Sequence, residues 1–380
     1  MTRRAGDDAS SEGSDEVSDD ASDEASDEAS AGRFGGAPNR ARTVKASDLR
    51  PGAPARRRPQ YLLHAALFLA TFLTTTASGA IRIHPTGDIA PIKDGLSYSI
   101  PLLLILLCHE LGHYLVARWH GVDASLPYFI PFPPWFGLGT MGAVIGMRRV
   151  TSDRRKLIDI GAAGPLAGLC VAIPVILYGL AHSTVGPLAP HGELEGNSIL
   201  YAVLKHLVKG TWLPDGRQDV FLHPTAFAGW AGLLVTMINL LPIGQLDGGH
   251  VATAYFGNRY NVFARRLHRF MPLVGVGVFF WVQHLVRVEM GANYRQDLGV
   301  NIALAAAFPW LVWYGLVGLV RRLGGGANHP PVQTRPLPRA RKALFWLMVL
   351  VFVAIFMPVP FRETITGEVP PPAAVTARVP

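Results

Sequence analysis

Long apolar runs separated by short polar segments dominate the chain. A helix that crosses a bilayer needs about 20 mostly apolar residues. Seven runs meet this requirement, at 61–80, 97–119, 158–181, 221–243, 268–287, 298–320 and 343–359. The seventh is the shortest, with 17 residues. The pattern therefore predicts an all-α polytopic membrane protein with about seven transmembrane helices, in which residues 61–359 form one membrane domain.

Residues 126–146 form a further apolar stretch, but one that does not suit a helix. The segment, LPYFIPFPPWFGLGTMGAVIG, contains four prolines and four glycines, which interrupt helical hydrogen bonding. Unpaired backbone is not tolerated against lipid. We therefore predict a re-entrant, β-hairpin-like segment pressed against protein, with a short strand or hairpin at 139–146. An ordinary interfacial loop is the alternative.

Composition and charge agree with a protein embedded in a lipid bilayer. Hydrophobic residues make up 49% of the chain and charged residues only 16%, which excludes a soluble globular protein. With the amino terminus inside, the inner segments hold 26 of the 35 Lys and Arg residues and the outer segments hold 9, as the positive-inside rule requires. Because these bases are spread over loops, we expect no nucleic-acid partner.

The two ends of the chain differ from the membrane domain. Eleven acidic residues and no basic ones lie between Asp7 and Glu28, and basic residues and prolines follow them. Such a segment cannot bury enough apolar surface to fold. We predict that residues 1–60 form a disordered cytoplasmic tail, first acidic and then basic, and that residues 360–380 are an unstructured tail. The two cysteines, Cys108 and Cys170, exclude a disulfide scaffold.

The second apolar run contains a metal-binding pattern, Cys-His-Glu-Leu-Gly-His, at residues 108–113. Histidines four residues apart lie on one face of a helix, so His109 and His113 can bind one Zn²⁺ ion. Glu110 is rotated by about 100° from His109 and reaches a metal-bound water as a general base. Ionisable side chains within a membrane helix are costly and mark a functional site.

A third ligand is expected from the end of the fourth run, within Asn239-Leu-Leu-Pro-Ile-Gly-Gln-Leu-Asp-Gly-Gly-His250. Pro242 ends or kinks the helix, and the glycines at 244, 248 and 249 allow the backbone to turn Asp247 toward a neighbouring helix. The second and fourth runs both end on the cytoplasmic side, so the two motifs can meet. For His250 a supporting role is favoured over ligation.

The third run carries small residues, Gly161, Gly164 and Gly168, around Pro165. Small residues at such spacing allow helices to approach closely. We interpret this segment as a packing surface and not as part of the chemistry.

These motifs together resemble the site-2 protease family of intramembrane zinc metalloproteases. The matching elements are HELGH at 109–113, GTMGAVI at 139–145, GPLAG at 164–168 and N-x-x-P-x-x-x-x-D-G-G-H at 239–250, in the order of the family. The resemblance covers a core at residues 97–260. The loop at 182–220 has 39 residues, which is too short for the PDZ domain of many relatives, so the chain looks like the subgroup without one.

The resemblance also implies roles for individual residues. His109, His113 and Asp247 match the ligands of one zinc ion per chain, Glu110 matches the catalytic acid/base, and Asn239 matches a position that supports the substrate or the oxyanion. Family members use the re-entrant segment to hold an unwound substrate strand. That role would fall here on the edge formed by Gly139, Thr140, Met141, Gly142 and Ala143.

The expected function is hydrolysis of peptide bonds in or near the transmembrane helix of another protein. By resemblance the substrate would be an anti-sigma factor, a membrane-tethered regulator or a signal-peptide remnant, and the location a bacterial cytoplasmic (inner) membrane. The alternative is a non-proteolytic protein, either a metal or proton transporter or an inactive scaffold. A transporter should carry more ionisable residues across its spans, and here they are few, chiefly Asp159, His223 and His284.

Overall fold

The computed structural model describes residues 60–83, 92–135, 137–147, 151–188, 191–323 and 329–365. The predicted amino-terminal tail at 1–60 lies outside this range except for Gln60, and so does the predicted tail beyond residue 365. All the elements below belong to the unit formed by residues 58–380.

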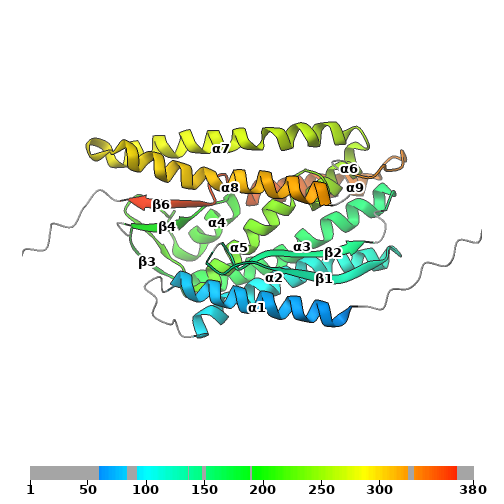
Figure 1. Cartoon of the computed structure of the whole chain (residues 1–380), viewed down its shortest axis with the longest axis horizontal. Coiled ribbons are helices and arrows are strands. Elements are labelled where there is room, and N and C mark those ends of the chain that lie inside the picture. Colours follow the sequence, from blue (N-terminus) through cyan, green and yellow to red (C-terminus); the bar gives the residue numbers. More distant parts are fainter. Residues whose placement is uncertain are drawn as a thin grey trace, which may run out of the picture. The chain divides into compact units, whose positions relative to one another are not determined.

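The described part is mostly helical, with short strands that pair in twos (Figure 1). The helices are α1 (Tyr61–Ile83), α2 (Ile92–Trp119), α3 (Arg154–Ala181), α4 (Ile199–Lys209), α5 (Pro224–Asn239), α6 (Asp247–Phe256), α7 (Tyr260–Met290), α8 (Gln296–Leu323) and α9 (Arg339–Ile355). The strands are β1 (Ala124–Pro131), β2 (Thr140–Met147), β3 (Thr184–Pro187), β4 (His191–Glu195), β5 (Gln218–Phe221) and β6 (Phe361–Ile365).

Five of the described helices are long and apolar enough to cross a membrane, namely α1, α2, α3, α7 and α8. This confirms a mostly helical chain with several membrane-length helices. The fourth and seventh predicted spans correspond to α5 and α9, which have only 16 and 17 residues. Both are shorter than the roughly 20 residues that a spanning helix normally has, so the count of seven stays a prediction.

Helices α2, α3 and α5 pack against one another and form the centre of the fold, with α1 on one side and the α7–α8 pair on the other (Figure 1). Glycines on α5 let these helices approach closely. A Cβ atom at Gly229 would lie 2.4 Å from Ile176 of α3, and one at Gly232 would lie 2.9 Å from Ile105 of α2. Most of the buried side chains are apolar and form one large cluster.

The apolar segment after α2 folds into a β-hairpin in which β1 pairs antiparallel with β2. The sequence indicated a strand or hairpin only at 139–146, but the proline-rich first half is a strand too. Its prolines are tolerated because the pairing register shifts at Pro127 and again at Pro131, where ladder hydrogen bonds are already interrupted. Entry of this hairpin into the membrane stays a prediction.

Three hydroxyl groups fix the turn of the hairpin on α1 and α2. The carbonyl oxygens of residues 137, 138 and 139 accept hydrogen bonds from Ser78 (3.1 Å), Tyr98 (3.1 Å) and Thr74 (2.7 Å), respectively. Gly139 has a φ of 76°, and a Cβ atom there would lie 2.6 Å from the carbonyl oxygen of Thr74. The turn therefore requires glycine at this position.

The prediction of an unstructured tail from residue 360 is wrong for Phe361–Ile365, which form β6. This strand pairs antiparallel with β4, and the ring of Phe361 packs edge-on against Trp230 of α5. The sequence of β6, FRETI, has no sustained apolar pattern. Its order comes from a partner strand about 170 residues earlier in the chain, which no local pattern indicates.

Removing the three hydroxyls should loosen the hairpin. In the variant Thr74→Val/Ser78→Ala/Tyr98→Phe, three carbonyl groups lose their donors, at about 1–3 kcal/mol for each one that stays buried. We expect faster amide hydrogen exchange across β2, measured by mass spectrometry in detergent. Thr71→Val is the control, because the Thr71 hydroxyl bonds within α1, to the carbonyl of Leu67. Equal exchange in both variants would contradict the role of the hydroxyls.

Candidate metal centre

Two buried histidines and a half-buried aspartate, from two helices, meet in the middle of the fold. His109 and His113 lie one turn apart on α2, and Asp247 is the first residue of α6. The carboxylate of Asp247 lies 3.1 Å from Nε2 of His109 and 3.2 Å from Nε2 of His113, and the two Nε2 atoms are 3.3 Å apart. Within the described residues, these three form the one group of His, Cys, Asp or Glu side chains with metal-ligand spacing.

This spacing suits a tetrahedral zinc ion. Two ligand atoms that are each about 2.1 Å from such an ion lie about 3.4 Å from one another. This is close to the 3.3 Å between the two Nε2 atoms, and to the 3.1 Å from His109 to Oδ2 and the 3.2 Å from His113 to Oδ1 of the Asp247 carboxylate. Two imidazoles and one carboxylate are also a common ligand set of catalytic zinc. The three predicted ligands therefore fit the metal that the sequence implied.

Hydrogen bonds around the three side chains prepare them for ligation. His113 donates from Nδ1 to the carbonyl of Ile160 on α3, 2.7 Å away, which leaves Nε2 free to bind a metal. Burial alone would raise the pKa of Asp247, but the charge of His113 and the hydrogen bonds of both imidazoles hold this pKa well below its usual value. Asp247 is therefore an ionised carboxylate at neutral pH, which is the form that a metal ligand requires.

Glu110 lies beside this group and outside it. Its side chain is buried on α2, with an exposed fraction of 5%, and its carboxylate accepts a hydrogen bond from the backbone amide of Ile145 in β2. The hairpin therefore lies next to the residue that the sequence indicated as a general base. Ile145 was not singled out as a partner of Glu110, because the contact crosses from a helix to a strand.

Glycines explain how Asp247 reaches the histidines. α5 ends at the half-buried Asn239, and a tight turn connects it to α6. A Cβ atom at Gly248 would lie 2.0 Å from the carbonyl oxygen of Leu240, and one at Gly249 would lie 2.4 Å from that of Gly244. The turn can therefore fold against the first turn of α6. Asn239 belongs to this connection, and its role toward a substrate stays a prediction.

The glycines of α3 pack directly against the two histidines. A Cβ atom at Gly164 would lie 2.1 Å from Nε2 of His113, and one at Gly168 would lie 3.2 Å from Cβ of His109. The segment is thus a packing surface, as the sequence indicated. What it packs against is the metal centre itself, and Gly164 leaves no space there for any side chain.

His250 lies outside the ligand group. Its Nδ1 atom is 2.9 Å from Nε2 of His329, which lies in the segment before α9. Nδ1 of His329 is 2.8 Å from the carbonyl oxygen of Pro330. Burial and the neighbouring His329 lower the pKa of His250 to about 3, so it is neutral. This agrees with the supporting role expected for His250. No pattern in the sequence indicates that His329 is its partner.

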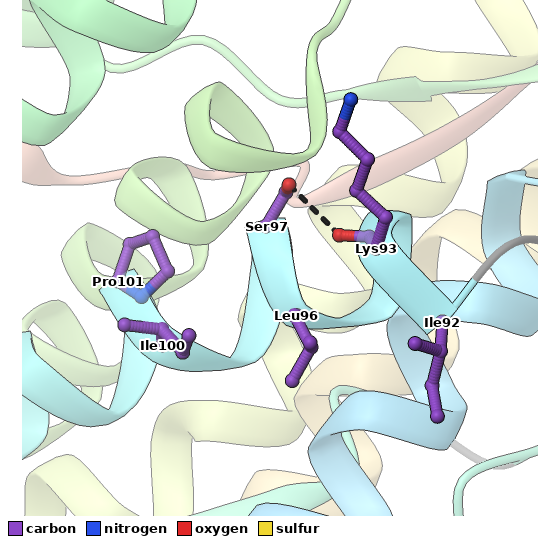
Figure 2. Close-up of a pocket in the computed structure, with 6 residues that line it drawn as sticks. All are labelled: Ile92, Lys93, Leu96, Ser97, Ile100 and Pro101. Atoms are coloured by element: carbon purple, nitrogen blue, oxygen red, sulfur yellow. Dashed lines mark hydrogen bonds between the residues drawn. The ribbon is translucent and has the colours of Figure 1, made fainter.

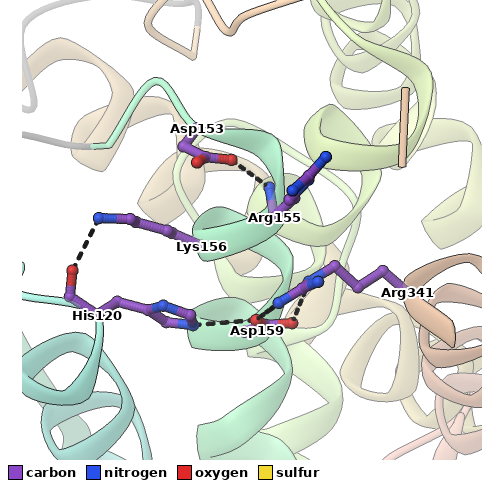
Figure 3. A network of polar contacts seen from close by, with 6 residues as sticks. All are labelled: His120, Asp153, Arg155, Lys156, Asp159 and Arg341. Atoms are coloured by element: carbon purple, nitrogen blue, oxygen red, sulfur yellow. Dashed lines mark hydrogen bonds and ion pairs between the residues drawn. The ribbon is translucent and has the colours of Figure 1, made fainter. Parts of the chain in front are cut away.

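A second polar network ties the carboxyl-terminal end of α2 to α3 and α9 (Figure 3). Asp159 of α3 accepts hydrogen bonds from the guanidinium of Arg341, the shortest of them 2.6 Å, and lies 3.0 Å from Nε2 of His120. Lys156 donates to the carbonyl of His120 at 2.8 Å. The network lies two helical turns beyond His113 and holds the end of the helix that carries both histidines.

The predicted substrate edge at 139–143 has mixed surroundings. The carbonyl of Gly139 accepts from Thr74, and the hydroxyl of Thr140 donates to the carbonyl of Ile130 at 2.9 Å, so both serve the hairpin itself. Met141 is exposed, whereas Ala143 is buried. Within the described residues the sheet has two strands, so the second edge of β2 pairs with no other strand.

An open groove of about 390 Å³ lies elsewhere, along the first turns of α2 (Figure 2). It is lined by Ile92, Lys93, Leu96, Ser97, Ile100 and Pro101. The hydroxyl of Ser97 donates to the carbonyl of Lys93, and the other lining side chains except Lys93 are apolar. The groove holds none of the metal-centre residues and offers no comparable chemistry.

Comparison with known proteins covers this same region. Residues 97–282 match the sequence profile of Peptidase family M50. The probable zinc metalloprotease EGY2, chloroplastic, of Arabidopsis thaliana is 31% identical over 209 residues, which is 53% of this chain and 36% of that protein. The probable zinc metalloprotease EGY1, chloroplastic, of the same plant is 38% identical over 167 residues, 43% of this chain and 29% of that protein.

The matched region therefore spans about a third of the length of these relatives. A third similar protein, the DDT domain-containing protein PTM of Arabidopsis thaliana, is 34% identical over 196 residues, which are 47% of this chain and 11% of that protein. No solved structure matches the chain significantly. The chloroplastic names do not support the expected bacterial inner membrane, whereas the apolar helices do support a multi-pass membrane protein.

The contact between Gly164 and His113 gives a direct test of the metal centre. In Gly164→Ala the new methyl group must displace the imidazole, and we expect zinc affinity to fall by about 10–100-fold, as for other changes that reorient a ligand. Zinc is measured by mass spectrometry after dialysis of the purified protein. Gly277→Ala is the matched control, since a Cβ atom at this helical glycine meets nothing within 4 Å. Normal zinc binding by Gly164→Ala would refute the packing argument.

Proposed function

The chain belongs to peptidase family M50, and from this premise we propose that it is an intramembrane zinc metalloprotease. It would hydrolyse peptide bonds in or near the transmembrane segments of other membrane proteins. The observation that carries the proposal is the convergence of His109, His113 and Asp247 next to the buried carboxylate of Glu110. Two histidines, a carboxylate ligand and an adjacent glutamate are the chemistry of metal-assisted hydrolysis.

One zinc ion would be held by His109, His113 and Asp247. When bound, zinc acts as a Lewis acid that activates water and polarises the carbonyl group under attack. Glu110 would accept a proton from the attacking water and later deliver it to the leaving amine. The amide of Ile145 supports this role, because its hydrogen bond fixes the Glu110 carboxylate in place.

Asn239 is proposed to stabilise the oxyanion that forms on the carbonyl oxygen when water attacks the carbonyl carbon. Its position supports this, since it is half-buried and ends α5 at the turn that leads to Asp247. The motif at 109–113 has the form His-Glu-x-x-His (HExxH) of zinc metalloproteases. With Asn239, the proposal gives a role to each of its two histidines, to its glutamate and to the polar residue at the end of α5.

The hairpin is proposed to hold the substrate as an added strand. A transmembrane helix hides its amides in its own hydrogen bonds, so it must unwind before attack. The second edge of β2 offers backbone groups for such a strand, and Ile145 in this strand contacts Glu110. The proposed binding edge consists of Gly139, Thr140, Met141, Gly142 and Ala143. The side chain of Met141 is exposed, which supports a contact with the substrate there.

The proposed substrates are membrane proteins with a single transmembrane helix, such as an anti-sigma factor, another tethered regulator or a signal-peptide remnant. We propose seven spans with the amino terminus on the basic, cytoplasmic side, where most Lys and Arg residues lie. The bacterial inner membrane is not proposed further, because the relatives reported above are named as chloroplastic proteins.

A transporter is the less supported reading. A transporter would use Asp159, His223 and His284, and two of these residues have structural partners. Asp159 forms an ion pair with Arg341. His223 caps the first turn of α5, because its side chain accepts a hydrogen bond from the amide of Thr225. The structure thus gives these two residues roles that need no transported ion.

Glu110→Gln tests the proposed acid/base role. The variant keeps all three ligands, so we expect wild-type zinc content together with a cleavage rate about 10²–10⁴-fold lower, the usual contribution of a general acid/base. Both are measured on detergent-purified protein with a panel of single-span membrane peptides. Glu363→Gln, which changes an exposed carboxylate, serves as the control. Cleavage by Glu110→Gln at the wild-type rate would exclude the assignment.

A further inference from the structure

One arginine outside the metal centre connects two of the helices that build it. Arg154 is the first residue of α3, and its guanidinium reaches the far end of α6. Nε donates to the carbonyl of Ala254 at 2.6 Å, and Nη2 donates to the carbonyl of Tyr255 at 2.5 Å. The partners are 100 and 101 residues away in sequence, so the contacts fix tertiary packing and not local structure.

The carbonyls that Arg154 binds are those which a helix leaves unpaired. The last four C=O groups of a helix lack partners within it and carry the negative end of its dipole. α6 ends at Phe256, one residue after Tyr255, and Gly257 follows with a φ of 75°. A guanidinium is planar, always charged and able to donate two hydrogen bonds in a fixed fork. The guanidinium of Arg154 therefore caps the carboxyl-terminal end of α6. Its positive charge lies at the negative end of the helix dipole, and its two N–H groups bond to two unpaired carbonyls.

At its other end, α6 carries the ligand Asp247. The helix has ten residues and is about 15 Å long, and a short helix moves as a rigid rod. Leu246, the residue before the helix, makes no side-chain cap at the amino-terminal end. The cap that Arg154 provides at the other end is therefore a strong polar hold on the position of α6. A shift of the rod would move the Asp247 carboxylate away from the histidines.

α3 also positions the other half of the ligand set. Its Ile160 carbonyl orients His113, six residues along the same helix from Arg154. We propose that Arg154 is a positioning residue for metal binding: by capping α6 from α3, it holds the Asp247 carboxylate at ligand distance from His109 and His113. This inference rests on the proposed function, since it takes these three residues as zinc ligands.

Arg154 makes one further contact, from Nη1 to the carbonyl of Arg335 at 3.2 Å. This contact holds the segment before α9 and is the longest of the three. A role confined to that segment would stabilise the fold without changing metal affinity. The two roles therefore differ in a measurable way.

The experiment compares zinc affinity in the full-length chain and in its Arg154→Ala, Arg154→Lys and Arg155→Ala variants, by competition with a zinc-binding dye in detergent. Arg155→Ala is the matched control. Arg155 is the next residue and its side chain is exposed, so this variant removes the same charge without removing the contacts of Arg154. We expect the dissociation constant of Arg154→Ala to rise about 10–100-fold, as when other outer partners of a metal site are lost. Arg154→Lys, which lacks the fork, should fall between this variant and the wild type.

Thermal melting with zinc chelated separates positioning from folding. Arg154→Ala should still fold but melt below Arg155→Ala, because it loses tertiary hydrogen bonds. Its cleavage of the peptide panel should nevertheless recover when zinc is added in excess. Equal zinc affinity in Arg154→Ala and Arg155→Ala would overturn the inference. If Arg154→Ala does not fold, Arg154→Lys decides the question: wild-type affinity in this variant would equally overturn it.

A second comparison guards against an indirect effect of the substitution. In an Asp247→Ala background the helix no longer supplies a ligand, so adding Arg154→Ala should leave the remaining zinc affinity unchanged. A further large loss there would show that Arg154 acts on the histidines and would overturn the proposal. A wild-type chain that binds no zinc would instead refute the proposed function, and this inference with it.

Discussion

Burial of two imidazoles and a carboxylate among apolar helices is the constraint on which the rest of the structure depends. In a medium of low dielectric constant an unpaired polar group is costly, and a well-placed one interacts strongly. His113 therefore has the carbonyl of Ile160 as its second partner, and Asp247 lies within 3.2 Å of both imidazoles. Glu110, equally buried, receives the amide of Ile145.

The same constraint explains the small residues around the site. The imidazole rings of His109 and His113 pack closely against α3. This leaves no space for side chains on that face of α3, so Gly164 and Gly168 lie there. Gly248 and Gly249 help to place Asp247. Because they have no side chains, the turn after α5 can pack against the first turn of α6. Close packing and chemistry are therefore set by the same short motifs.

The sequence predicts those parts of the protein that depend on local geometry. Histidines four residues apart must share a helix face, and a proline with three glycines indicates that Asp247 follows a sharp turn. Features that depend on distant partners escape such reasoning. β1 forms in spite of Pro127 because the pairing register shifts there, and β6 is ordered by β4. In sequence, Arg154 looks like any basic residue at the end of an apolar run.

The position of α3 follows from how the ligands are distributed. His109 and Asp247 are 138 residues apart, so no local segment can set the distance between them. An element that contacts both α2 and α6 must do so, and α3 packs against each of them. It meets α2 through glycine faces and the Ile160 carbonyl, and it meets α6 at Gly161, where a Cβ atom would lie 3.2 Å from His250. A helix that supplies none of the three side chains thus determines whether they can meet.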